Sequence, residues 1–191
     1  MTIIERPDWL PITKFKPPRV HADLISRPQL EIRMAACVRQ CPITLVSAPA
    51  GYGKTTLICN WITESQQRSS LATEEATASG YAWITLDAAD NDPVRFLSLL
   101  LYAIEPLADD FGATVHRFLQ STGLQAEPGA PDIQMQRMYG AFINDLTEIE
   151  PQQFVLVLDD FHLITDPVLL SGFDFLFDHL PPHQKPLRLH T

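Results

Sequence analysis

Apolar residues along this chain follow two alternating patterns, one typical of buried strands and the other of amphipathic helices. Short runs with almost no polar side chain occur at residues 43–46, 81–86 and 154–158, as expected for strands covered on both faces of a sheet. Between these runs, apolar residues recur every three or four positions, which predicts helices with one buried face. Strands alternating with helices predict an α/β chain with a parallel sheet and right-handed crossovers.

The ends of the expected helices carry capping signals. Asp92 precedes Pro93, and Asp166 precedes Pro167. Each pair places a capping carboxylate before a proline at the first helical position, where the missing N–H breaks no helical hydrogen bond. Asp132 is the expected cap of another helix. The expected helices cover residues 27–39, 54–66, 93–104, 111–119, 132–148 and 167–179.

The remaining segments are expected to be connections. Residues 1–18 contain four prolines and are predicted to form an extended arm rather than a packed element. Residues 187–190 begin a fourth strand, so we expect one domain over residues 19–191 whose sheet is incomplete at the C-terminal end. The expected loops and turns are residues 68–80, 87–92 and 120–131.

The junction between the first strand and the next helix carries the strongest chemical signal, because residues 47–56 read SAPAGYGKTT. Such a loop can point successive N–H groups into one concavity, and the helix N-terminus adds further donors for phosphate. Lys54 would reach the β- and γ-phosphates, and Thr55 would ligate Mg²⁺. The alternative is a plain turn, and the full pattern has glycine where Ala48 stands. The expected nucleotide-contacting residues are Ala48, Gly51, Tyr52, Gly53, Lys54, Thr55 and Thr56.

A second motif, FVLVLDDFH at residues 154–162, is an apolar strand that ends in two carboxylates. In a phosphate-loop fold, the acid after such a strand lies beside the loop and holds Mg²⁺ directly or through water. Asp159 is the candidate for that role. Asp160 is the candidate for orienting or deprotonating an attacking water. The alternative is that both residues only close a strand, and the earlier loop favours the functional interpretation.

Three other residues could belong to the same site. Asp87 ends the second strand at the expected carboxyl edge of the sheet, where it could support the site or only form a turn. His162 could sense the γ-phosphate or simply pack. Arg27 could contact the base or the phosphates of a nucleotide, although an arginine at a helix start is often only a surface residue.

Composition narrows the possible functions. The chain has 191 residues, 46% hydrophobic and 19% charged, which is typical of a soluble globular protein. A net charge of -9 without a basic cluster argues against nucleic-acid binding by this segment. The cysteines, Cys37, Cys41 and Cys59, are odd in number and are expected to be buried thiols. No signal peptide or membrane span is expected, so we predict a cytoplasmic location.

Together these motifs resemble the ATPase domain of the large ATP-binding LuxR-type transcriptional regulators, the MalT-like group of STAND NTPases. The resemblance covers about residues 19–185, without the loops at 65–80 and 106–135. It is carried by the approach at residues 19–30, by SAPAGYGKTT, by YAWITLDAADNDPVRFLSLLLYAI at 81–104, by FVLVLDDFHLITDPVLL at 154–170 and by FLFDHLPP at 175–182.

The resemblance implies a signalling switch built on a three-layer P-loop NTPase sandwich. In that family the nucleotide domain precedes a winged-helix segment, a helical sensor array and a helix-turn-helix DNA-binding domain. ATP with an inducer favours self-association and transcription activation, and hydrolysis resets the state. The residues matching the phosphate loop would hold ATP and Mg²⁺, with Asp159 as the metal-side acid and Asp160 as the hydrolytic one.

The chain departs from the family pattern at its end. The family follows the Pro-Pro segment with a strand that ends in Ser-Arg or Thr-Arg, whereas this chain reads KPLRLHT. We therefore expect a truncated product, a part of a longer regulator or a stand-alone remnant, with partner domains or self-association completing it. The ATPase activity of the segment alone is left open. Two other functions stay open: a small phosphate-transferring P-loop kinase, and a non-catalytic interaction fragment whose sheet edge needs a partner.

Overall fold

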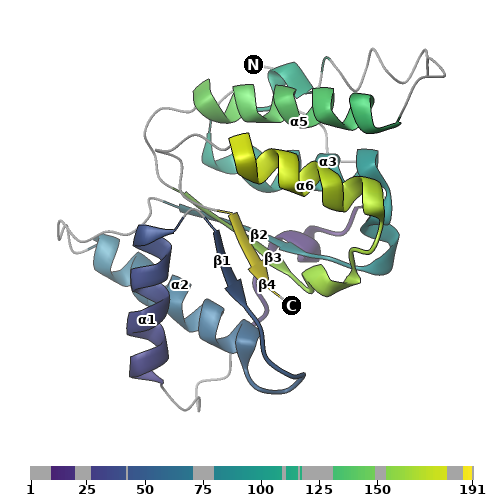
Figure 1. Ribbon diagram of the computed structural model, residues 1–191. Helices are drawn as coiled ribbons and strands as arrows, with labels where there is room; N and C mark the ends of the chain where they lie inside the picture. The colour runs from purple at the N-terminus through teal and green to yellow at the C-terminus, as the bar shows by residue number, and fades with distance from the viewer. Residues whose placement is uncertain are drawn as a thin grey trace. The chain divides into compact units, whose positions relative to one another are not determined.

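The computed structural model describes residues 10–19, 27–41, 43–70, 80–108, 111–115, 117, 131–148, 154–179 and 187–190. It shows a mixed α/β chain with a small parallel sheet, as the alternating pattern predicts (Figure 1). The chain forms two compact units. The sheet unit contains Ile12–Thr85, Gln152–His162 and Lys185–Thr191, and the helical unit contains Met1–Pro11, Leu86–Pro151 and Leu163–Gln184.

The sheet has four parallel strands in the order β1-β4-β3-β2. Because the strands are parallel, their carboxyl ends share one edge, where Thr85 of β2 is in register with Asp159 of β3. The fourth strand expected at residues 187–190 is confirmed, and it lies between β1 and β3. The strands are β1 (Ile43–Val46), β2 (Gly80–Thr85), β3 (Phe154–Asp159) and β4 (Leu187–His190).

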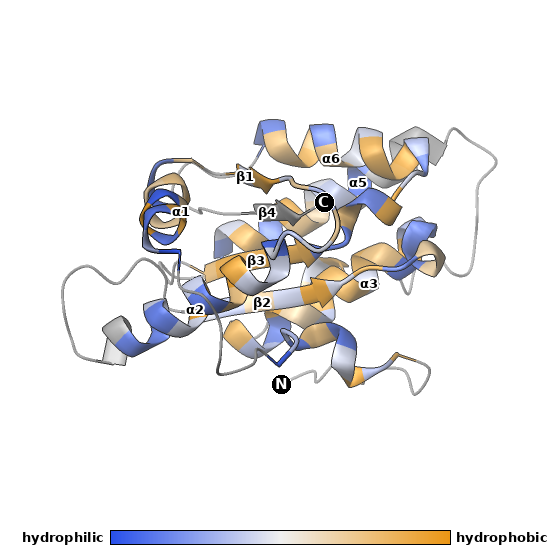
Figure 2. Cartoon of the chain, turned by 90° about the horizontal axis from the view of Figure 1, so that it is seen from below, coloured by the Kyte–Doolittle hydropathy of each residue, from blue (hydrophilic) through white to orange (hydrophobic). Residues whose placement is uncertain are grey.

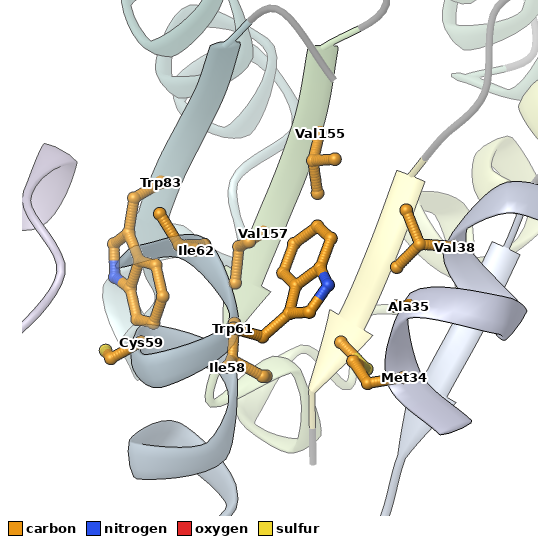
Figure 3. Close-up of a cluster of buried hydrophobic side chains, with 10 residues drawn as sticks. All are labelled: Met34, Ala35, Val38, Ile58, Cys59, Trp61, Ile62, Trp83, Val155 and Val157. Atoms are coloured by element: carbon orange, nitrogen blue, oxygen red, sulfur yellow. The ribbon is translucent and has the colours of Figure 1, made fainter. Parts of the chain in front are cut away.

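Two helices of the sheet unit, α1 (Pro28–Gln40) and α2 (Lys54–Ser70), share a hydrophobic cluster with β2 and β3. In Figure 3, Trp61 of α2 lies between Val155 of β3 and the α1 side chains. Both helices are amphipathic, and Figure 2 shows hydrophobic and hydrophilic residues along α2. The cluster contains Met34, Ala35, Val38, Ile58, Cys59, Trp61, Ile62, Trp83, Val155 and Val157.

The helical unit contains α3 (Pro93–Ile104), α5 (Pro131–Glu148) and α6 (Pro167–His179). Aromatic rings pack between these helices: the Phe173 centroid lies 5.1 Å from that of Phe96, in an edge-to-face arrangement. Tyr139 of α5 is tilted against Phe173 at 6.2 Å. Such pairs stabilise a core beyond their burial alone. The described positions of the expected helix at 111–119 are a turn at 111–112 and helical residues at 113–115 and 117.

Helix ends agree with the capping signals at two places and differ at a third. Asp92 caps α3 by accepting from the Arg95 N–H at 2.8 Å, and Asp166 caps α6 by accepting from Leu169 N–H at 2.9 Å. The predicted cap at Asp132 is wrong, because α5 already begins at Pro131. Proline at the first helical position makes this earlier start possible.

Two segments predicted to be irregular are helical in part. The helix expected to end near residue 66 continues to Ser70 as α2, because Ser, Gln and Arg do not break a helix once it has started. Part of the arm at 1–18 is a 3-10 helix, η1 (Ile12–Phe15), in which Lys14 is buried and its Nζ donates to Thr85 O at 3.2 Å. This part of the arm is therefore packed. The boundary at residues 18 and 19 stays a prediction.

Candidate functional site

The loop between β1 and α2 depends on two glycines with left-handed backbone angles. Gly51 has φ 81° and Gly53 has φ 80°, values that side-chain-bearing residues rarely adopt. Leu57 N–H donates to Gly53 O at 2.9 Å as the first helical bond of α2. The N–H groups before it have no partner within the helix, so they are available to an anion at the helix N-terminus.

Lys54 folds back over this loop. Its Nζ donates to Ala48 O at 2.7 Å and to Pro49 O at 3.4 Å. The ammonium group is thus held by the carbonyls of the loop that the sequence predicts to bind phosphate. A bound anion would exchange these neutral acceptors for charged ones, which make stronger hydrogen bonds.

Thr55 and Asp159 meet although they are far apart in the sequence. Thr55 Oγ1 donates to Asp159 Oδ1 at 3.3 Å, and the Asp159 side chain is buried at the end of β3. Burial raises the pKa of the nearby Cys59 thiol to about 11, and the negative charge of Asp159 adds to the rise. The two residues predicted to share a metal ion are therefore adjacent, with the carboxylate aimed at the start of α2.

Asp160 has an unusual backbone conformation. Its φ is 59°, and among the described residues it is the only one other than glycine with a positive φ. Aspartate tolerates this region better than most residues, and such angles cluster at functional sites. Its N–H donates to Asp159 Oδ1 at 3.1 Å. His162 Nδ1 lies 3.9 Å from Asp160 Oδ1, and both side chains are about half exposed to solvent.

Arg27 contacts the loop rather than only solvent. Its guanidinium donates to Tyr52 O at 3.2 Å, which places it beside the predicted phosphate-binding residues. Its own backbone N–H donates to Glu31 Oε1 at 3.3 Å. Tyr52 itself has a largely exposed side chain, 64% accessible. A contact of Arg27 or Tyr52 with a nucleotide stays a prediction.

Asp87 is engaged in local structure. Its carboxylate accepts from Ala89 N–H at 2.8 Å, and its own N–H donates to Asp90 Oδ2 at 2.8 Å. This reciprocal capping fixes the 3-10 helix η2 (Ala88–Asn91). Asp87 therefore has a local structural role, and the segment expected as a plain turn at 87–92 contains a 3-10 helix. A supporting role of Asp87 at the site stays a prediction.

The donors at the loop suit Mg²⁺ better than a transition metal. Within the described ranges, no cluster of three or more His, Cys, Asp or Glu side chains could hold a metal ion. Mg²⁺ prefers one or two carboxylates together with waters and substrate phosphates, and the pair of Thr55 and Asp159 fits that preference. The expectation of buried thiols holds only for Cys59, because Cys41 is exposed and Cys37 is partly exposed.

These features define a mixed α/β chain in which a glycine-bearing loop and a buried acid meet at the carboxyl edge of a parallel sheet. The chain is related to transcriptional regulators of the MalT type. It is 33% identical over 146 residues to the HTH-type transcriptional regulator MalT of Cronobacter sakazakii, a match that covers 74% of this chain. The corresponding values are 26% over 174 residues for MalT of Vibrio cholerae and 32% over 143 residues for MalT of Serratia proteamaculans.

The chain spans only 13% to 16% of the length of these relatives. No protein-family model matches it. Within the part of the chain that the structure describes, no helix is long and apolar enough to cross a membrane.

Proposed function

We propose that this chain is the ATP-binding switch module of a MalT-type transcriptional regulator. The observation that carries the proposal is the contact between Thr55 Oγ1 and Asp159 Oδ1 at 3.3 Å, below a loop shaped by two left-handed glycines. A plain turn requires the glycines but not a buried carboxylate aimed at the first turn of the following helix. The relation to MalT-type regulators supports the same proposal.

Different groups of the loop would bind different parts of the nucleotide and its metal ion. Backbone N–H groups of the turn and of the first residues of α2 would bind phosphate oxygens. Lys54 would leave the carbonyls of Ala48 and Pro49 to pair with the β- and γ-phosphates. Thr55 and Asp159 would hold Mg²⁺ directly or through water, and the ion would neutralise charge on the phosphates.

Hydrolysis, if the segment performs it alone, would depend on Asp160. Its carboxylate would accept a proton from the water whose oxygen attacks the γ-phosphorus. The bond from the γ-phosphorus to the bridging oxygen would then break, and ADP and phosphate would leave. The exposed position of Asp160 leaves room for such a water. In the longer regulator, this step would return the switch to its resting state.

The proposal is tested by nucleotide-dependent thermal stabilisation of the full 191-residue chain with Lys54→Ala. A ligand at a hundredfold excess over its dissociation constant stabilises a protein by about 2.7 kcal/mol, so Mg-ATP should raise the melting temperature of the wild type by several degrees. K54A should lose this shift. The matched control is Lys16→Ala, because Lys16 is exposed. Equal shifts in the wild type and K54A would contradict the proposal.

A further inference from the structure

The carbonyl of Tyr52 lies between the two left-handed glycines of the loop, and it accepts a hydrogen bond from the Arg27 guanidinium. The distance from Arg27 Nη1 to Tyr52 O is 3.2 Å, although the two residues are 25 positions apart. The hydrogen bonds of Lys54 stay within the loop, because its Nζ donates to the carbonyls of Ala48 and Pro49. The bond from Arg27 instead joins the loop to the start of a different element, α1.

Arg27 itself is held by the first turn of α1. Its carbonyl accepts from the N–H groups of Leu30 at 2.9 Å and Glu31 at 3.1 Å. Its own N–H donates to Glu31 Oε1 at 3.3 Å, and Glu31 is buried. Further along α1, Met34 belongs to the hydrophobic cluster that also contains Trp61 of α2. The guanidinium thus extends from a helix that shares a core with the helix following the loop.

The bond to Tyr52 O fixes the orientation of the peptide group between Tyr52 and Gly53. A peptide group is planar and almost always trans, so its C=O and its N–H point in opposite directions. With the carbonyl turned to Arg27, the Gly53 N–H points away from the guanidinium. This N–H is the first of four that have no partner within α2, because the first helical bond runs from Leu57 N–H to Gly53 O. It is therefore one of the donors available to a phosphate oxygen.

The glycines on either side give this peptide group freedom to turn. Glycine populates positive and negative φ about equally, so the backbone at positions 51 and 53 sets little preference of its own for the observed angles. A hydrogen bond from a charged donor is stronger than one from a neutral donor. The Arg27 guanidinium therefore supplies the preference that the two glycines lack.

We propose that Arg27 is a positioning residue that holds the Gly53 N–H in the orientation for binding phosphate. It acts through Tyr52 O and not by touching the ligand. The identity of the anion rests on the proposed function, in which it is a phosphate of Mg-ATP. A donor that is oriented in advance binds more tightly, because the ligand does not have to order the loop. Removal of the guanidinium should therefore loosen the nucleotide-free loop and weaken binding together.

The experiment compares Arg27→Ala with Arg33→Ala in the full chain, because Arg33 is an exposed arginine on the same helix and both changes remove one positive charge. NMR relaxation gives the order parameter of the Gly53 amide without nucleotide. It should fall from roughly 0.85 in the wild type to below about 0.6 in R27A. The dissociation constant for Mg-ATP, measured by calorimetry, should rise about fivefold, as expected for the loss of one hydrogen bond. R33A should match the wild type in both.

Two further measurements separate positioning from a direct contact with the ligand. Arg27→Lys keeps a long charged donor, so it should restore most of the Gly53 order parameter in the nucleotide-free chain. Inorganic pyrophosphate with Mg²⁺ offers phosphates without a base, and R27A should weaken its binding by the same factor as that of Mg-ATP. Weaker binding of Mg-ATP beside unchanged binding of pyrophosphate would overturn the inference, because it would indicate a contact between Arg27 and the base.

An unchanged Gly53 order parameter in R27A would also overturn the inference, whether or not the chain binds ATP. So would an unchanged affinity for Mg-ATP beside a lowered order parameter. A wild-type chain that binds no Mg-ATP, with thermal shifts equal to those of K54A, would overturn the proposed function instead. In that case a lowered order parameter in R27A would still show that Arg27 orients the loop.

Discussion

Glycine is required at position 53 by the backbone angle there and not by crowding from neighbouring atoms. A Cβ at this position would meet its nearest neighbour, Thr56 Cβ, at 4.0 Å, so the space exists for a side chain. The φ of 80° is what disfavours a side chain, because the left-handed conformation costs a residue with a Cβ about 1 to 2 kcal/mol. The same reasoning applies to Gly51, where nothing lies within 4 Å.

We therefore predict that Gly53→Ala lowers the free energy of unfolding by at least about 1 kcal/mol. The matched control is Gly140→Ala. Gly140 lies in the helical interior of α5, and a Cβ there meets nothing within 4 Å. G140A should raise the free energy of unfolding by about 0.5 to 1 kcal/mol. Urea denaturation followed by circular dichroism measures both changes, and a stabilising G53A would contradict the prediction.

Cys59 and Cys41 should differ sharply in reactivity. Burial, assisted by the charge of Asp159, raises the pKa of the Cys59 thiol to about 11, whereas Cys41 is exposed. The thiolate is the reactive form, so at pH 8 Cys41 should react with a chromogenic disulfide reagent and Cys59 should not. Reaction of Cys59 should appear only on unfolding. Cys41→Ser identifies the fast thiol, and fast labelling that survives this change at Cys59 would contradict the prediction.

The same raised pKa has a consequence for stability. The folded state holds the Cys59 proton to higher pH than the unfolded chain, in which the thiol has its ordinary pKa of 9.0. The contribution of the protonated thiol is therefore fully present below pH 9 and is lost as the pH rises toward 11. Cys59→Ala should show a smaller loss of stability over this alkaline range than the wild type.

At the scale of elements, the contact between α5 and α6 depends on the absence of a side chain. Gly172 of α6 is buried, and a Cβ there would overlap the ring of Tyr139 on α5. Tyr139 is almost fully buried, and its burial raises the pKa of its hydroxyl. A ring enclosed in this way has little room to move aside.

We predict that Gly172→Ala lowers the free energy of unfolding by about 1 to 3 kcal/mol, as overpacking of a core usually does. The gain in helix propensity, about 1 kcal/mol, is too small to offset the overlap. G140A again serves as the control, since it adds the same methyl group to α5 without a collision. Tyr139→Leu in the G172A background should recover part of the loss, and additive effects of the two changes would contradict the mechanism.

Elements with strong local signals were predictable from the sequence. The order Asp92-Pro93 and Asp166-Pro167 fixed two helix starts, because capping is a local interaction. The sheet order was not predictable, because nothing in the residues of β4 says that it lies between β1 and β3. The packing of Lys14 was hidden by the prolines around it, which are as common in linkers as at packed turns.

Some features of the candidate site could likewise be predicted from the sequence, and others could not. Gly51, Gly53, Lys54 and Thr55 could be named because their spacing is a pattern, and Asp159 because it follows an apolar strand. The contact of the Arg27 guanidinium with Tyr52 O could not be predicted, because the two residues lie 25 positions apart and no spacing pattern joins them. Such a contact becomes visible only when the fold brings the two residues together.

At the scale of the whole molecule, the sheet unit carries every residue of the proposed nucleotide site. The length of the chain is a small share of that of its relatives. We still predict that this segment does not itself bind DNA, because its net charge is -9 and the DNA backbone is also negative. For this segment we therefore propose nucleotide binding and not DNA binding.

The hydrophobic cluster around Trp61 makes the intrinsic tryptophan fluorescence of the chain sensitive to the packing of α2. Trp61 lies about two turns after Lys54 on α2, and its indole N–H is buried with no hydrogen-bond partner in the described part of the chain. The indole of Trp83 instead donates to Thr85 Oγ1 at 2.9 Å. The two indoles should therefore emit at different wavelengths. A ligand that shifts α2 against β3 would change the wavelength of maximum emission of Trp61, so no added dye is needed to detect it.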